Sequence, residues 1–323
     1  MKHVYIHIPF CKNICSYCDF CKMYHLPKFT ENYFEALKKE VEDSYMDELI
    51  STIYIGGGTP SCLTNEELDK LFNIVSIFKK STDCEFTFEC NPEDITEELI
   101  TYLIKNGINR LSIGVESFNK ENLEFMERKM DYKDLEEKLN MIRAKGINNI
   151  NLDLIYALPN ESLDTLKKDV KKLLKLNPEH ISTYSLIIEE DTKLKLNNTS
   201  YIDEELDAKM YDYICSKLKK NYTHYEVSNF AKEGFESKHN MAYWLNEEYY
   251  GFGLGASGYI NGFRYENTHN LNDYLEGEYH KEESLLSNEE IMEYEVILGL
   301  RMLKGINWKT SWRIKRSTRV GVE

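Results

Sequence analysis

The chain has 323 residues, a formal net charge of −15 and no basic stripe before its last residues, which argues against nucleic acid as a partner. It has no run of 18 uninterrupted apolar residues and no signal-peptide-like apolar segment at its start. We therefore expect a cytoplasmic protein, with docking at the inner face of the membrane left open. Eight cysteines, three of them between residues 11 and 18, point to a metal site rather than a disulfide scaffold.

Strand-like and helical segments alternate along the first 200 residues. The predicted strands cover residues 4–8, 52–55, 85–89, 110–115, 150–156 and 180–188. The predicted helices cover about 30–47, 65–79, 95–105, a pair within 120–145, and 162–175. Six β-then-α units predict an α/β fold with a parallel sheet and right-handed crossovers. Since a closed barrel of this kind needs eight strands, we expect an open, partial (β/α)6 TIM-like barrel over residues 1–200.

The pattern changes after residue 200. A helix at 203–220, a strand at 224–229, a stretch rich in glycine and tyrosine, and a helix at 288–303 predict a smaller α+β region over 201–306. Residues 307–323 carry five Lys or Arg and one acid, against the acidic trend of the rest. We expect this atypical basic tail to be poorly packed and to reflect a truncated or shifted reading frame.

Three cysteines follow the first predicted strand with the spacing Cys11-x-x-x-Cys15-x-x-Cys18. Three thiolates suit three irons of a cubane cluster and leave the fourth iron open, as a catalytic metal site requires. The alternative is a zinc site with Cys21 or His25 as the fourth ligand. Zinc sites usually combine two CxxC-like pairs, and no second pair is visible, so a [4Fe–4S] cluster is favoured.

A glycine-rich loop, Gly56-Gly57-Gly58-Thr59-Pro60, follows the second of these strands. Glycine allows backbone groups to come close to a ligand. This loop and the cysteine spacing, with Tyr17 before the third cysteine, resemble the radical SAM superfamily. In that family S-adenosylmethionine (SAM) chelates the open iron, and an electron from the cluster cleaves it to a 5′-deoxyadenosyl radical. The resemblance implies a [4Fe–4S] cluster on the three cysteines, SAM, and an electron donor.

The resemblance also implies which residues contact SAM. They are Tyr5, Tyr17, Gly57, Gly58, Thr59, Glu89, Glu116, Arg128 and Asp153. Arg128 would pair with the methionine carboxylate and Asp153 would hydrogen-bond the ribose. Glu116 stands where the family has a glutamine. The alternatives are that Arg128 forms a surface ion pair and that Glu89 caps the next helix.

The segment Tyr5-Ile6-His7-Ile8-Pro9-Phe10 is typical of the coproporphyrinogen III oxidase-like branch of this superfamily. The branch contains a decarboxylating enzyme of porphyrin synthesis and a heme chaperone that delivers heme to respiratory proteins. The decarboxylase has a longer segment before its cysteine motif and a fourth cysteine two residues after the third. Phe20 stands at that place here, and Cys21, one residue later, is expected to have no essential role.

The segment His239-Asn240-Met241-Ala242-Tyr243-Trp244 resembles the His-Asn-x-x-Tyr-Trp motif of the heme chaperones. The resemblance implies a protein that binds heme and transfers it to an acceptor protein. His239 would be an axial ligand of the heme iron, and Tyr243 and Trp244 would pack on the porphyrin. The alternatives are a plain packing element for the motif, and coproporphyrinogen decarboxylation for the protein.

Overall fold

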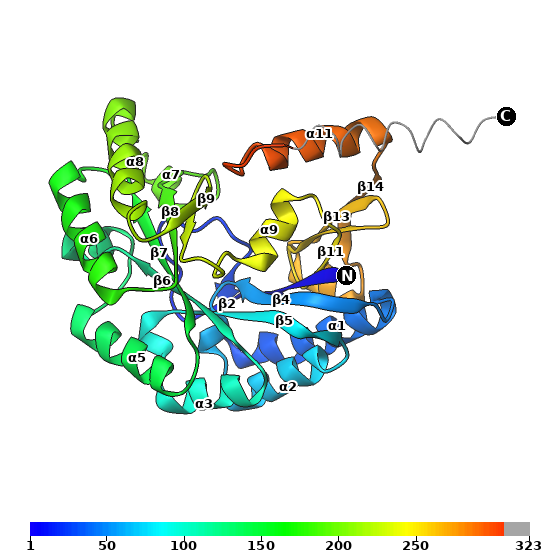
Figure 1. Cartoon of the computed structure of the whole chain (residues 1–323). Coiled ribbons are helices and arrows are strands. Elements are labelled where there is room, and N and C mark those ends of the chain that lie inside the picture. The colour runs from blue at the N-terminus through cyan, green and yellow to red at the C-terminus, as the bar shows by residue number, and fades with distance from the viewer. Residues whose placement is uncertain (307–323) are drawn as a thin grey trace.

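The computed structural model describes residues 1–306, and its centre is a parallel sheet curved into an open barrel (Figure 1). The six parallel strands lie next to one another in the order in which they occur along the chain. Two short strands, which come between the first and the second of them in the sequence, form a separate small sheet. The six parallel strands are β1 (Lys2–Ile8), β4 (Leu49–Gly57), β5 (Lys79–Cys90), β6 (Arg110–Glu116), β7 (Asn149–Tyr156) and β8 (His180–Ser185). The predicted α/β class and partial barrel are confirmed.

Helices cover the outer, convex side of these strands (Figure 1). They are α1 (Pro27–Ser44), α2 (Asn65–Val75), α3 (Glu97–Lys105), α4 (Lys120–Phe125), α5 (Tyr132–Ala144) and α6 (Leu163–Leu176). The sequence sets their starts locally: in α2, the Thr64 side chain accepts from the N–H of Glu67, and the Glu67 side chain accepts from the N–H of Thr64. α6 ends where Asn177 adopts a left-handed conformation with φ 51°.

Strands from beyond residue 200 extend the same sheet at both edges, so that within residues 1–306 this sheet has twelve strands. At one edge β1 is joined by β11 (Tyr249–Phe252), β12 (Ser257–Ile260), β13 (Phe263–Asn267) and β14 (His280–Leu285). At the other edge β8 is joined by β10 (Asn229–Ala231) and β9 (Thr223–Glu226). Strands from both sides of residue 200 therefore belong to one sheet. The division of the chain into two regions at this residue stays a prediction.

The remaining elements connect or cover these strands. They are β2 (Phe10–Cys11), β3 (Met23–Tyr24), the 3-10 turns Pro60–Cys62 and Pro92–Asp94, α7 (Lys193–Leu196), α8 (Glu204–Leu218), α9 (Lys238–Trp244), α10 (Leu271–Glu276) and α11 (Asn288–Gly299). Within residues 1–306, no helix combines the length and apolarity needed to cross a membrane. The prediction made for residues 307–323 lies outside the described residues.

Several predicted boundaries are wrong, and for two of them the structure shows the cause. The helix expected to reach Lys79 ends four residues earlier, because Lys79 pairs with Leu49 and already belongs to β5. The single strand expected at 224–229 is a hairpin, because the chain reverses at Val227 and Ser228 so that Asn229 pairs with Glu226. The hairpin adds an antiparallel edge to the sheet.

The two faces of the parallel strands differ in character, as the period of two along a strand requires. In β5, Phe86 and Phe88 pack against Phe72 of α2 and belong to the main core. On either side of this pair along the strand, Glu85 and Glu89 point to the inner side of the barrel, where Glu89 lines a cavity. The apolar face holds the helices on the sheet, and the polar inner face is left for the site.

Candidate cluster and cofactor site

A cavity of about 390 Å³ opens at the carboxyl ends of the parallel strands. Eight of the nine residues expected to contact SAM line it, together with all three cysteines of the motif. In a parallel barrel this is the end at which loops gather functional side chains. The predicted cluster loop, glycine loop, acids and arginine are therefore brought together in space.

Hydrogen bonds to three distant segments hold the cysteine loop. The hydroxyl and the N–H of Ser16 donate to the carbonyls of Phe125 and Met126, at 2.9 and 3.3 Å. The N–H of Leu194 donates to the Ser16 carbonyl at 3.2 Å, and that of His25 donates to the Cys11 carbonyl at 2.9 Å. The protein thus orders the loop through its own contacts.

The three thiols suit a cluster better than a single zinc ion. Among the described residues, no three or more His, Cys, Asp or Glu side chains gather closely enough to hold one ion. A cubane offers each thiolate its own iron, so its ligands need not meet at one point. Burial raises the pKa of Cys18 to about 11, so its thiolate requires a cation such as iron to stabilise it.

Neither expected zinc partner faces the thiols. The Nε2 of His25 is 2.8 Å from the Glu67 carboxylate, which is committed to the start of α2. Cys21 is absent from the lining of the main cavity, and its Cβ lies against Gly255. The structure therefore brings three thiols to the main cavity and places Cys21 against Gly255 instead.

The glycine loop is pressed against the cysteine loop. The N–H groups of Gly58 and Thr59 donate to the carbonyls of Ile8 and Phe10, both at 2.8 Å. A Cβ built on Gly58 would lie 2.9 Å from the Cys11 sulfur, so no larger residue fits there without moving that thiol. The Thr59 hydroxyl lies 3.5 Å from the same sulfur.

Three half-buried carboxyl groups surround the cavity. Glu89 accepts from the Tyr54 hydroxyl at 2.7 Å and from the N–H of Gly57 at 3.0 Å. Burial raises the pKa of Glu89 and of Glu116 to about 7, and nearby Asp153 adds to both shifts. Burial also raises the pKa of Asp153. Carboxyls crowded in this way favour a positively charged ligand. Glu89 binds Tyr54 and Gly57, so the helix-cap alternative is wrong.

Arg128 is half-buried beside the cysteines. Its Nη1 donates to Asn91 Oδ1 at 2.8 Å and lies 3.8 Å from the Cys15 sulfur, and its Nη2 donates to the carbonyl of Gly114. Its Nε has no hydrogen-bond partner among the described residues. The surface ion pair considered for Arg128 is therefore wrong, and its guanidinium faces the cavity as a carboxylate-binding group would.

A second cavity of about 280 Å³ adjoins the first. The two share Tyr54, Gly57 and Glu89 in their walls, and Tyr5 lines only the second. The Tyr5 hydroxyl lies 3.0 Å from His7 Nδ1. Tyr17 lines the first cavity, so the two aromatic residues expected near SAM lie in different cavities.

The residues expected to contact heme are divided between two places. His239 and Tyr243 line the second cavity, four residues apart on one face of α9. Trp244 lies on the next face, where its ring stacks under the Arg301 guanidinium at 4.4 Å and lines a third cavity, whose wall also includes Tyr243. Both ring nitrogens of His239 are engaged: Nδ1 lies 2.6 Å from the Thr52 hydroxyl, and Nε2 lies 2.8 Å from the Tyr243 hydroxyl.

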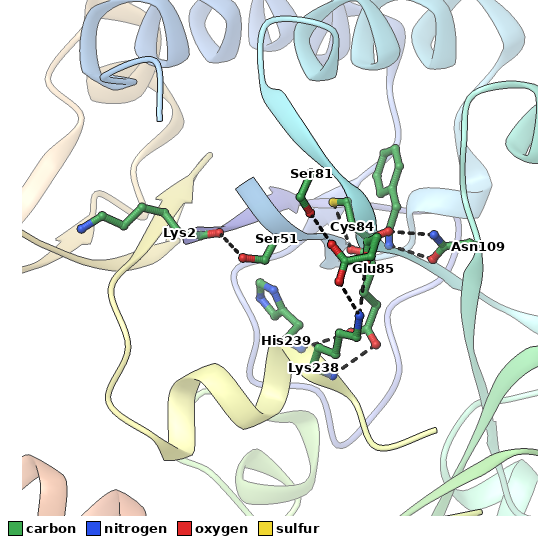
Figure 2. Close-up of polar contacts among 10 residues, drawn as sticks. Lys2, Ser51, Ser81, Cys84, Glu85, Asn109, Lys238 and His239 are labelled. Atoms are coloured by element: carbon green, nitrogen blue, oxygen red, sulfur yellow. Dashed lines mark hydrogen bonds and ion pairs between the residues drawn. The ribbon is translucent and has the colours of Figure 1, made fainter. Parts of the chain in front are cut away.

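The start of α9 is fixed to the barrel by a carboxylate. Figure 2 shows Glu85 directed at the first turn of α9, where its two oxygens accept from the N–H groups of Lys238 and His239, both at 3.1 Å. The helix with the His-Asn-x-x-Tyr-Trp motif is thereby attached to the strand that also carries Glu89. Glu85 could not be predicted from the sequence, because nothing in its spacing marks it as part of a site.

The site also contains Tyr54, Arg110 and Asn151, which the sequence analysis did not name. They lie on the inner face of β4, β6 and β7, and all three line the first cavity. Arg110 is 1% exposed, and its Nε has no partner among the described residues. The signal that could have found them is the alternation of polar residues along strands whose other face is apolar.

The fold and this site define the class of protein. The family model described as the radical SAM superfamily matches residues 5–173. The solved structure of coproporphyrinogen III oxidase (HemN) from Escherichia coli, described as a radical SAM enzyme, has the same fold, with a TM-score of 0.83. It is 23% identical, and the match covers 93% of this chain and 75% of that one.

Curated relatives narrow the class. The heme chaperone HemW of Lactococcus lactis subsp. lactis (strain IL1403) is 41% identical over 314 residues, covering 94% of this chain and 82% of the relative. The heme chaperone HemW of Bacillus subtilis (strain 168) is 39% identical, covering 96% of this chain and 86% of the relative. The chain belongs to the radical SAM superfamily and, within it, to the HemW family of heme chaperones.

Proposed function

We propose that this protein binds a [4Fe–4S] cluster, SAM and heme, and that it passes the heme to an acceptor protein. The observation that carries the proposal is the pair of adjoining cavities. One contains the thiols and the glycine loop, and the other contains His239 and Tyr243. Membership of the HemW family supports the heme part of the proposal, and the order of the cysteine and glycine loops supports the cluster and SAM.

Cys11, Cys15 and Cys18 would hold the cluster, and SAM would occupy the rest of the first cavity. When bound, these groups supply one-electron chemistry at the open iron. The protein's residues provide complementary charge. SAM is a net cation with one carboxylate, which suits Arg128 for that carboxylate and the surrounding acids, Glu89 above all, for the positive groups.

Heme would be received beside α9. His239, Tyr243 and Trp244 are the proposed heme contacts, and one hydrogen bond in the structure must break before His239 can serve. Because the Tyr243 hydroxyl caps Nε2 of His239 at 2.8 Å, that hydroxyl must turn away before His239 can bind iron. The aromatic side chains of Tyr5 and Tyr54 on the walls of the second cavity provide apolar surface for a porphyrin edge.

The first experiment tests the cluster. The protein is reconstituted with iron and sulfide without oxygen, and iron content and the visible absorbance of the cluster are measured. We expect about four irons per chain. Cys15→Ser should lose the cluster, while the matched variant Cys21→Ser should keep it. A cluster that survives Cys15→Ser but needs Cys21 would contradict the proposed ligand set.

The second experiment separates heme handling from decarboxylation. Heme is titrated into the reconstituted protein and followed by its Soret band, and coproporphyrinogen turnover with SAM is assayed in parallel. We expect stoichiometric heme uptake, loss of heme to an apo-form b-type cytochrome used as the acceptor probe, and no decarboxylation. Decarboxylation without heme uptake would overturn the proposal in favour of the oxidase function.

A further inference from the structure

A row of polar residues crosses the sheet below α9. His3 of β1 is directly paired with Thr52 of β4, and Thr52 is directly paired with Glu85 of β5. All three are buried, and their side chains lie on the inner face of the sheet. His239 rests on this row, because its N–H donates to Glu85 and its ring contacts Thr52.

A continuous chain of hydrogen bonds runs through this row from the surface to the second cavity. The half-exposed carboxylate of Glu247 lies 2.8 Å from His3 Nε2, and His3 Nδ1 lies 2.9 Å from the Thr52 hydroxyl. That hydroxyl lies 2.6 Å from His239 Nδ1, and His239 Nε2 lies 2.8 Å from the Tyr243 hydroxyl. Both imidazoles in the chain thus have both nitrogens engaged.

The acceptor at the outer end gives this chain a direction. The hydrogen bond from His3 holds the pKa of Glu247 below its ordinary value, so the carboxylate is ionised and can only accept. His3 therefore donates from Nε2. We take its buried ring, with one nitrogen facing an anion and the other facing a hydroxyl, as carrying that one proton only, which leaves Nδ1 as an acceptor. The Thr52 hydroxyl has one proton and gives it to His3.

The proton of Thr52 also sets the direction of the hydrogen bonds at the inner end, at His239 and Tyr243. Because the Thr52 proton points to His3, its oxygen accepts from His239, which must carry its proton on Nδ1. His239 is 1% exposed, and both of its ring nitrogens face hydroxyl groups, with no carboxylate of the described residues hydrogen-bonded to them, so the ring carries no second proton. Nε2 is then an acceptor, and the Tyr243 hydroxyl donates to it.

We propose that Glu247, His3 and Thr52 are positioning residues that hold His239 in the tautomer protonated on Nδ1, with the lone pair of Nε2 directed to the second cavity. The inference rests on the proposed heme function for its purpose and on the hydrogen-bond chain for its geometry. An imidazole binds a metal through its unprotonated nitrogen while the other N–H is held by an acceptor. Thr52 is that acceptor here.

The arrangement lets heme bind without a change of tautomer. Before heme arrives, the Tyr243 hydroxyl donates to Nε2 and satisfies it inside the protein. When that hydroxyl turns away, the same lone pair is available to iron, and Thr52 continues to hold Nδ1. The opposite tautomer would place a proton where the iron must bind.

The test uses the ring tautomer itself, which can be read without heme. Long-range ¹H–¹⁵N NMR spectra of the histidine side chains are recorded, and the His239 signals are identified by their loss in His239→Gln. We expect the proton on Nδ1 in the wild type and in Thr52→Ser, which keeps the hydroxyl. We expect this preference to be lost in Thr52→Val and in Glu247→Ala, whose half-exposed site tolerates substitution.

Heme titration then measures the consequence. Affinity should fall by about 10-fold or more in Thr52→Val and stay near the wild-type value in Thr52→Ser. A wild-type proton on Nε2, or a tautomer unchanged in both Thr52→Val and Glu247→Ala, would overturn the inference. A wild-type protein with the expected tautomer but no heme uptake would instead contradict the proposed function, so the two failures are distinguishable.

Discussion

A carboxylate oxygen of Glu85 accepts a hydrogen bond from the backbone N–H of His239, 3.1 Å away and 154 positions later in the chain. The other oxygen accepts from the preceding N–H, and the side chain is 6% exposed. These two bonds satisfy backbone donors that a helix start leaves without partners. They also fix the helix that carries the heme-chaperone motif relative to the barrel.

Removing this carboxylate should loosen α9. We expect Glu85→Ala to lower the free energy of unfolding by about 1–3 kcal/mol, because two N–H groups at the start of α9, including that of the buried His239, lose their partners. Urea unfolding followed by fluorescence measures the change. Asp83→Ala is the matched control, since Asp83 is exposed and pairs with Lys238 only at 3.5 Å. Equal effects of the two substitutions would contradict the anchoring role of Glu85.

Two substitutions in the glycine loop should distinguish the residues that support cluster binding from those that support SAM binding. A methyl group at Gly58 would meet the Cys11 sulfur at 2.9 Å, whereas one at Gly56 would meet the Glu89 carboxylate at 2.8 Å. We therefore expect Gly58→Ala to lower the iron content after reconstitution. Gly56→Ala should keep its iron and bind SAM more weakly. Iron analysis and equilibrium dialysis with labelled SAM measure both, and full iron content in Gly58→Ala would refute the steric argument.

SAM binding should strengthen as pH rises. Burial raises the pKa of Glu89 to about 7, so the carboxyl of the free protein is mostly neutral at pH 6 and mostly ionised at pH 7.5. A cationic ligand prefers the ionised form, so the apparent affinity should increase by roughly 8-fold over this range.

Anaerobic equilibrium dialysis at several pH values measures this affinity. Glu89→Gln should bind SAM weakly with a reduced pH dependence, and Glu98→Gln, on the exposed side of α3, should behave as the wild type. An unchanged pH profile in Glu89→Gln would show that another group is responsible.

Stability should respond to pH through Glu40. This side chain is 2% exposed and accepts from Tyr274 Oη at 2.5 Å, Asn267 Nδ2 at 2.6 Å and the N–H of Gly253 at 2.9 Å. Burial outweighs these bonds and raises its pKa from 4.5 to about 7. Between these values the folded state keeps a proton that the unfolded chain has lost, so Glu40 reduces stability as pH rises toward 7.

Replacement by glutamine should remove this contribution. The unfolding free energy of Glu40→Gln minus that of the wild type should increase by about 1–3 kcal/mol as the pH is raised from 5 to 8. The free Oδ1 of Asn267 can accept from the new amide if the Asn267 side chain turns. Guanidinium unfolding at several pH values measures the difference. Glu42→Gln, exposed on the same helix, should show no such trend.

The fold was largely predictable because its signals are local. Apolar runs followed by amphipathic helices gave six β-then-α units, and capping residues such as Thr64 and Ser162 mark helix starts close to the predicted ones. The boundary at Lys79 failed because pairing with Leu49, a contact across the sheet, decides it. Strand pairing at the sheet edges beyond residue 200 is likewise set by distant partners.

Site residues that belong to a motif of fixed spacing could be predicted from the sequence. Single polar residues that reach the site only because a strand turns them to the inner face of the barrel could not. The cysteines and the glycine loop follow fixed spacings, whereas Arg110 and Glu85 are single polar residues within strands. Trp244 was grouped with His239 because the two share a motif. A helix turns by about 100° per residue, so positions four apart share a face and the fifth does not. The structure accordingly separates Trp244 from His239.

The position of β1 in the sheet has a consequence for how the chain is made. One side of β1 pairs with β4, but the other side waits for β11, whose last residue is Phe252. At 5–20 residues per second, about 10–50 s pass between the synthesis of these two strands. During that time the nascent barrel has an unpaired edge at its first strand, the kind of surface that invites pairing with other chains. The topology therefore leaves one edge of the first strand open to such pairing until Phe252 has been made.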